Sequence, residues 1–273
     1  MKTRIISGAS LIIIVAALFW LQLYLPIALV IAAAILGAMG VFEILNNTKL
    51  CQNKALLIVS ALPALVVPFV AMGYLAIPLT LVYTLYAIIV FVLILKFHSQ
   101  LDIKSVLSVL VLPIFISFAL ATVVCVTQYG NVGLFYILAV LCWSALADTG
   151  AYFVGVTFGK HKMAPVVSPK KSVEGAIGGL VLSSAFNVAV FAGVREWIFG
   201  GESAFSFAFI IIMSVVLSAV SMLGDLSASL LKRNFGIKDF GNIMPGHGGI
   251  MDRFDSLIFV APVLAAAIKF VNM

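Results

Sequence analysis

Runs of about 20 mostly apolar residues follow one another along almost the whole of this chain, and a run of that length is what an α-helix needs to cross a lipid bilayer. There are nine such runs, at residues 5–24, 26–45, 55–74, 76–95, 107–127, 132–157, 173–194, 204–230 and 250–271. Of the 273 residues, 64% are hydrophobic and only 10% are charged, against about 25% charged in soluble domains. Only lipid can solvate so much apolar surface. The sequence therefore predicts an all-α, polytopic integral membrane protein with about nine transmembrane helices.

The positions of the basic residues predict the orientation of these helices, because Lys and Arg collect in cytoplasmic loops. With the N-terminus in the cytoplasm, nine spans leave all 16 Lys and Arg residues on the cytoplasmic side except Arg195 and Lys269. The N-terminus is therefore predicted to be cytoplasmic and the C-terminus to lie outside. We expect the first run to be a retained helix, since it is long enough to span, and the protein to lie in the cytoplasmic (inner) membrane.

Polarity divides the chain into two regions. Up to about residue 130 the apolar runs are almost free of ionisable groups, whereas acidic residues lie within or beside the later runs. We expect residues 1–130 to be a transmembrane scaffold and residues 131–273 to be a catalytic region whose site faces the cytoplasm. The net charge of +6 fits cytoplasmic loops that face anionic head groups and anionic substrates and does not call for a nucleic-acid partner.

Two single carboxylates, Asp148 and Asp225, are candidates for function because they lie inside apolar runs. A charged side chain at the centre of a spanning helix costs at least about 2.5 kcal/mol. Each is flanked by small residues, which allow another helix or a ligand to approach closely. The alternative interpretation is structural, since a lone Asp can also hydrogen-bond to a neighbouring helix or reach the interface.

A pair of carboxylates, Asp252 and Asp255, lies at the start of the last run. On a helix, residues three apart share a face, and acidic groups there also compensate the helix dipole. Two carboxylates on one face suit a hard cation such as Mg²⁺, which takes oxygen ligands and keeps positions for water and substrate phosphates. Asp225, on the preceding run, is a candidate third ligand.

A glycine-rich stretch at residues 245–249 precedes this pair and contains His247. Its backbone can approach an anion closely, and free N–H groups at a helix start bind phosphate, although a tight interfacial turn would also use glycines. Basic residues surround it in the sequence: Lys160, Lys162, Lys170, Lys171, Lys232, Arg233 and Lys238. For Lys160 and Lys162, ordinary cytoplasmic-loop charge explains the sequence equally well. Carboxylates beside cations are what phosphoryl or nucleotidyl transfer needs.

Residues 229–255, the signature segment, resemble the signature of the phosphatidate cytidylyltransferases (CDP-diacylglycerol synthases). The resemblance is carried by Ser229, Lys232, Arg233, Lys238, Asp239, Gly241, Pro245, Gly246, His247, Gly248, Gly249, Asp252, Arg253 and Asp255. Residues 148–152 and 168–175 are also similar to that family, so the resemblance covers at least the C-terminal half. Met244 stands where the family usually has Leu, Ile or Phe, which is a conservative difference.

The resemblance implies that CTP and phosphatidate give CDP-diacylglycerol and pyrophosphate in phospholipid biosynthesis, with Mg²⁺ and with a second metal ion left open. It implies metal ligands at Asp225, Asp252 and Asp255, and catalytic residues at these three positions and at Lys238 and His247. It implies substrate-binding residues at Lys170, Lys171, Lys232, Arg233, Gly248, Gly249, Arg253, Asp148, Tyr152, Glu174 and Asp239. A homodimer is compatible with so many spans outside the catalytic region.

Two other functions fit parts of the sequence. A CTP-dependent polyprenol or lipid kinase would share the membrane, the nucleotide and the metal, and would differ in its product. A cation-coupled transporter would also carry acidic residues within its spans. Against a transporter, the sequence has no visible inverted repeat, and its charges gather at one membrane face.

Overall fold

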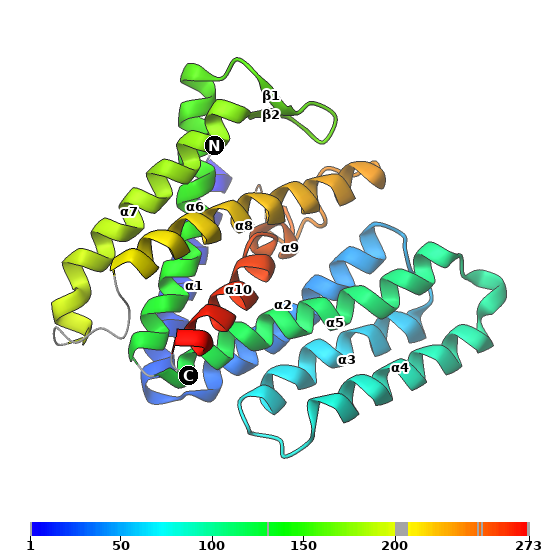
Figure 1. Cartoon of the computed structure of the whole chain (residues 1–273). Helices are drawn as coiled ribbons and strands as arrows, with labels where there is room; N and C mark the ends of the chain where they lie inside the picture. Colours follow the sequence, from blue (N-terminus) through cyan, green and yellow to red (C-terminus); the bar gives the residue numbers. More distant parts are fainter. Residues whose placement is uncertain (1, 130, 200–206, 245, 247, 272–273) are drawn as a thin grey trace. The chain divides into compact units, whose positions relative to one another are not determined.

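The computed structural model describes residues 2–129, 131–199, 207–244, 246 and 248–271 (Figure 1). Within these residues the secondary structure is helical apart from two short strands, which confirms the all-α class. The chain divides into two compact units. Unit 1 comprises residues 1–125 and 235–254, and unit 2 comprises residues 126–234 and 255–273. The predicted division at residue 130, into a scaffold region and a catalytic region, is a division by function. The two structural units do not test it, so it stays a prediction.

Unit 1 is built from consecutive helices and one returning segment. Its elements are α1 (Lys2–Tyr24), α2 (Ile27–Asn47), α3 (Lys54–Ala71), α4 (Leu79–Lys96), the short helix η1 (His98–Gln100), α5 (Ile103–Val126) and α9 (Met251–Phe254). The segment 235–254, which ends in α9, packs against α2 although some 200 residues separate them in the sequence, as in the bond from Met251 to Glu43.

Unit 2 contains the remaining helices and the two strands. Its elements are η2 (Thr127–Tyr129), α6 (Asn131–Phe158), β1 (Lys162–Ala164), β2 (Ser168–Ser172), α7 (Val173–Phe199), α8 (Phe207–Asn234) and α10 (Leu257–Val271). The strands form an antiparallel hairpin in which Lys162 pairs with Ser172 and Ala164 with Ser168. Figure 1 shows this hairpin at one end of α6 and α7. No sequence feature predicted these strands.

Seven helices among the described residues are long and apolar enough to span a membrane: α1, α2, α3, α4, α5, α7 and α8. They coincide with seven of the nine apolar runs. Helix α6 covers the run at 132–157, and α9 and α10 cover the run at 250–271. The polytopic membrane class is thus confirmed, whereas the count of nine spans and their orientation stay predictions.

Three prolines lie within residues 55–95, where the sequence predicts two spans. In the structure Pro63 and Pro68 lie inside α3, and Pro78 directly precedes α4. Helix α3 begins where the Asn53 side chain accepts hydrogen bonds from the N–H groups of Ala55 and Leu56, at 3.0 and 3.3 Å, as N-cap residues do. Neighbouring helices make interior prolines tolerable in membrane proteins.

The expectation of one continuous helix from residue 250 is wrong. Helix α9 ends at Phe254, residues 255 and 256 form a turn, and α10 begins at Leu257. The Asp255 side chain binds within this turn, because its Oδ1 accepts a hydrogen bond from the backbone N–H of Ser256 at 2.8 Å. The argument that Asp252 and Asp255 share one face of a regular helix therefore fails.

Small residues let α6 and α7 approach each other closely in unit 2. A Cβ atom added to Gly179 would lie 2.5 Å from the carbonyl oxygen of Ala147, and one added to Gly175 would lie 2.6 Å from that of Ala151. The four-residue spacing on both helices matches the small-xxx-small pattern of close membrane helix pairs. Farther along α7, Ser183 and Ser218 of α8 share a 2.7 Å hydrogen bond.

Gly179→Ala is expected to lower the stability of the protein in detergent by about 1–3 kcal/mol, because the new methyl group meets backbone that cannot move aside. Gly193→Ala on the same helix is the matched control, since no atom that the structure describes lies within 4 Å of a Cβ there and alanine favours a helix over glycine by up to about 1 kcal/mol. Thermal unfolding of both variants measures the difference. Equal stabilities would contradict the close packing of α6 and α7.

Candidate functional site

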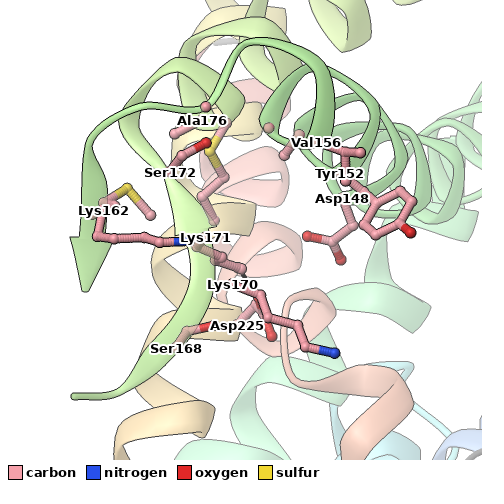
Figure 2. A pocket seen from close by; sticks show the side chains of 15 residues that line it. Asp148, Tyr152, Val156, Lys162, Ser168, Lys170, Lys171, Ser172, Ala176 and Asp225 are labelled. Carbon is pink, nitrogen blue, oxygen red and sulfur yellow. Dashed lines mark hydrogen bonds and ion pairs between the residues drawn. The ribbon is translucent and has the colours of Figure 1, made fainter. Parts of the chain in front are cut away.

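A cavity of about 700 Å³ lies in unit 2, where α6, α7, α8 and the hairpin meet. We call it the carboxylate pocket. Its lining residues are Asp148, Ala151, Tyr152, Gly155, Val156, Gly159, Lys162, Met163, Ser168, Lys170, Lys171, Ser172, Ala176, Met222 and Asp225. Figure 2 shows the Asp148 side chain of α6 and the Lys170 and Lys171 side chains of β2 around the same space. Five residues expected at the site, Asp148, Tyr152, Lys170, Lys171 and Asp225, are thus brought together.

An ion pair joins the hairpin to α8 in this pocket. The Lys171 ammonium group binds the Asp225 carboxylate, and each side chain is 22% exposed. Asp225 lies among small and apolar residues of α8, so the pair offsets part of the cost of placing a carboxylate there. The pair also fixes the lysine side chain at the pocket wall.

A second pair lies farther along α8. Lys232 Nζ is 3.9 Å from Asp255 Oδ2, and both side chains are 11% exposed. Asp225 and Lys232 are seven residues apart, so they share one face of α8. Asp255 also interacts electrostatically with Asp225 and Asp148. Asp255 therefore experiences the negative charge of both other carboxylates, and lysines lie beside Asp225 and Asp255.

The hairpin is anchored at its base by Ser172 and Glu174. Ser172 Oγ accepts a hydrogen bond from the backbone N–H of Gly175 at 3.1 Å and so caps α7. The Glu174 carboxylate accepts bonds from the backbone N–H groups of Lys160 and His161 at 3.1 and 3.2 Å and binds His161 Nδ1 at 2.6 Å. At the tip, Arg233 Nε donates to the carbonyl oxygen of Val167 at 3.4 Å. Glu174 and Arg233, both expected to bind substrate, hold the hairpin in the structure.

Residues 235–254 of the signature segment lie in unit 1, where the described residues 240–244, 246 and 248–250 form what we call the glycine loop. Asp252 closes it, since its Oδ2 accepts hydrogen bonds from the backbone N–H groups of Phe240 at 2.7 Å and Gly249 at 3.0 Å. Gly248 has φ = +87°, a conformation that favours glycine. Lys238, Asp239 and Arg253 are exposed beside the loop. His247 lies outside the described residues.

The donor chemistry of the carboxylate pocket fits Mg²⁺. Within the described part of the chain, no three His, Cys, Asp or Glu side chains gather closely enough to form a ready metal site. Mg²⁺ does not require three, because it is usually held by one or two carboxylates together with water and substrate phosphates. Asp148 and Asp225 line the same pocket, so two carboxylates are available there for a divalent cation. The assignment of Asp225, Asp252 and Asp255 as metal ligands stays a prediction.

Sequence reasoning missed several residues of these sites. Lys162 was left open between function and ordinary loop charge, Ser168 was noted only within the similar range 168–175, and Met222 was not considered. All three line the carboxylate pocket, and only the fold of the hairpin and its contact with α8 could have placed them there. Glu43 of α2, a buried carboxylate beside the glycine loop, was also missed, although its position inside an apolar run marked it.

Comparison with known proteins gives a match along almost the whole chain, because the model of the cytidylyltransferase family covers residues 2–271. The chain is 45% identical over 132 residues to the phosphatidate cytidylyltransferase of Staphylococcus haemolyticus (strain JCSC1435), which is 48% of this chain and 48% of that protein. It is 44% identical over 137 residues to the phosphatidate cytidylyltransferase of Bacillus subtilis (strain 168), which is 50% of this chain and 47% of that protein. The chain thus spans about half the length of the curated relatives it matches.

Glu174→Ala is expected to loosen the base of the hairpin, because three hydrogen-bond donors of residues 160 and 161 lose their acceptor. Trypsin should then cut after Lys160 and Lys162 several-fold faster, and Glu174→Gln should retain part of the protection. Thr157→Ala is the control, since the Thr157 hydroxyl bonds only within its own helix. Unchanged cleavage in Glu174→Ala would show that the carboxylate does not hold the hairpin.

Proposed function

Because the chain belongs to the cytidylyltransferase family, we propose that it is a phosphatidate cytidylyltransferase, which transfers CMP from CTP to phosphatidate and gives CDP-diacylglycerol and pyrophosphate. The observation that carries the proposal is the carboxylate pocket, in which lysines and carboxylates from separate elements line one cavity. The similarity to the phosphatidate cytidylyltransferases of S. haemolyticus and B. subtilis supports it.

The reaction is a displacement at phosphorus. An oxygen of the phosphatidate phosphate attacks the α-phosphorus of CTP and forms a new O–P bond. The bond from that phosphorus to the oxygen leading to the β-phosphate breaks, and pyrophosphate leaves with the electron pair. The attacking phosphate is already largely anionic near neutral pH, so little general-base help is needed. The main demand is to bring two anions together and to stabilise the charge between them.

The lysines of the hairpin meet that demand in this proposal. Lys162, Lys170 and Lys171 line the carboxylate pocket and would bind phosphate oxygens of CTP or of the lipid. The pair with Asp225 orients Lys171 before substrate arrives, so less side-chain entropy is lost on binding. Lys232, Lys238, His247, Arg253, Gly248 and Gly249 are proposed to contact the phosphates as well.

Magnesium is proposed as the cofactor, held by Asp225 with Asp148 or Asp255 among the carboxylates of unit 2. When bound, it would neutralise charge on the triphosphate and orient it. Asp252 is retained as a proposed ligand, although one of its oxygens already accepts two backbone hydrogen bonds.

The pocket is proposed to face the cytoplasm. The hairpin follows α6, and the positive-inside distribution assigns that loop to the cytoplasmic side, where CTP is available. Lys162, Lys170 and Lys171 would then attract the anionic nucleotide and anionic head groups to the same face.

Lys171→Ala is expected to lower kcat/KM for CTP by roughly 10- to 100-fold, since a charge-assisted contact is lost and Asp225 is left without its partner. Lys104→Ala removes the same charge from an exposed position at the start of α5 and should leave activity unchanged. The assay follows labelled CTP into lipid and identifies the products. Lipid phosphate and CDP as products would indicate the kinase instead, and nucleotide-independent ion uptake into liposomes would indicate a transporter.

Removal of divalent cations with a chelator is expected to abolish CMP transfer, and added Mg²⁺ should restore it. Asp225→Asn should lower kcat by roughly 100- to 1,000-fold at limiting Mg²⁺ and raise the Mg²⁺ concentration that gives half-maximal rate. Full activity of the chelator-treated protein would refute the metal proposal. A normal Mg²⁺ dependence in Asp225→Asn would remove this residue from the ligand set.

A further inference from the structure

Helix α2 presents one polar face to the glycine loop within unit 1. Gly40, Glu43 and Asn47 lie three and four residues apart, so they share a side of the helix. The Asn47 side chain donates a hydrogen bond from Nδ2 to the carbonyl oxygen of Phe240 at 2.6 Å. A Cβ atom at Gly40 would lie 3.3 Å from the sulfur of Met251. Both ends of the glycine loop therefore contact the same helix face.

Glu43 is the central residue of this face and is only 2% exposed. Its Oε2 accepts a hydrogen bond from the backbone N–H of Met251 at 2.9 Å. Its Oε1 is buried and accepts no hydrogen bond from the residues that the structure describes. Burial of a carboxylate is costly, which argues that the side chain serves a purpose other than stability.

Glycines of the loop form a cradle around this carboxylate. A Cβ atom at Gly241 or at Gly249 would overlap the Glu43 carboxylate group. Neither glycine has a positive φ, so close approach to Glu43 explains why a side chain is excluded there. The fit of the loop against α2 thus depends on the size of the side chain at position 43 as well as on its hydrogen bond.

Asp252 binds the same loop from within. It accepts the backbone N–H groups of Phe240 and Gly249, while α2 binds the carbonyl of Phe240 and the N–H of Met251. The conformation of the glycine loop is therefore fixed by two carboxylates, one from the signature segment and one from α2.

We propose that Glu43 is a positioning residue for nucleotidyl transfer, which holds the glycine loop and the adjacent Asp252 in their working conformation. This inference rests on the proposed function, since the loop matters for catalysis only if the signature segment contacts the substrates. Glu43 acts through its size and its hydrogen bond to Met251. Glu43→Gln preserves both features, whereas Glu43→Ala preserves neither.

Hydrogen exchange of the backbone amides of residues 240–251 tests the positioning directly and needs no activity. Glu43→Ala should raise exchange there, while Glu43→Gln should stay close to the unsubstituted protein. Phe42→Ala is the matched control, since Phe42 neighbours Glu43 on α2 but is 50% exposed, and it should change neither loop exchange nor activity. Unchanged exchange in Glu43→Ala would overturn the proposal, whatever reaction the protein catalyses.

Kinetics then link the loop to the reaction. Glu43→Ala should lower kcat for CMP transfer by roughly 10- to 100-fold, as a small misplacement of reacting groups does, with a smaller change in the KM for CTP, and Glu43→Gln should recover most of the rate. If Glu43→Gln had normal loop exchange but the low kcat of Glu43→Ala, the positioning role would be overturned. The negative charge of Glu43 would then be what the reaction needs. If the unsubstituted protein forms no CDP-lipid, the proposed function fails and the exchange result still stands.

A double-mutant cycle of Glu43→Ala and Gly241→Ala isolates the contact between Glu43 and Gly241. Gly241→Ala alone should raise loop exchange and lower kcat, because its methyl group meets the Glu43 carboxylate. Combined with Glu43→Ala, the added methyl group fills vacated space, so the double variant should be more active than the product of the two single effects predicts. If the effects of the two single variants on kcat were strictly additive in free energy, the proposed contact between Gly241 and Glu43 would be overturned. Gly241→Ala also provides both readouts if Glu43→Ala does not fold.

Discussion

The cost of placing a carboxylate inside an apolar helical protein governs how this structure is organised. Two acidic side chains of the carboxylate pocket region pair with lysines, Asp225 with Lys171 and Asp255 with Lys232. Glu43 and Asp252 instead accept backbone N–H groups of the segment 240–251. These two solutions have different consequences. An ion pair can be exchanged for a substrate phosphate or a metal ion, whereas a carboxylate that binds backbone amides fixes the shape of a loop.

Close helix packing makes the ion-paired solution possible. The α6–α7 contact depends on glycines at positions 175 and 179, whose neighbours are backbone atoms of α6. The hairpin connects α6 to α7, because β1 follows α6 and β2 leads directly into α7. The contact between the two helices therefore sets the points at which the hairpin begins and ends. Ser172 and Glu174 then hold the hairpin base, which brings Lys170 and Lys171 to the pocket. Small residues on two apolar helices therefore decide where the basic residues lie.

The apolar runs predicted the helices well, because helix length in a membrane is set by bilayer thickness and leaves a strong signal in the sequence. The hairpin could not be predicted, since its strands are three and five residues long and depend on contacts with Glu174 and Arg233. The break at residue 255 was missed for a related reason, because Asp255 bonds its own turn instead of continuing a helix. Of the site, the meeting of Asp148, Lys170, Lys171 and Asp225 follows the sequence interpretation. The sequence interpretation did not predict that Glu174 and Arg233 hold the hairpin.

Glu43 shows how a residue far from a signature can belong to its working structure. The rule that singled out Asp148 and Asp225, a lone carboxylate in an apolar run, applies equally to Glu43. The residue was overlooked because the first 130 residues carry few charges and were interpreted as scaffold. The residues that contact Glu43, Met251 and Gly241, lie about 200 positions away in the sequence. Met251 contributes a backbone N–H group, and Gly241 leaves room for the carboxylate because it has no side chain. Neither feature has a distinctive residue type, so only the fold reveals that a scaffold helix carries the group that shapes the glycine loop.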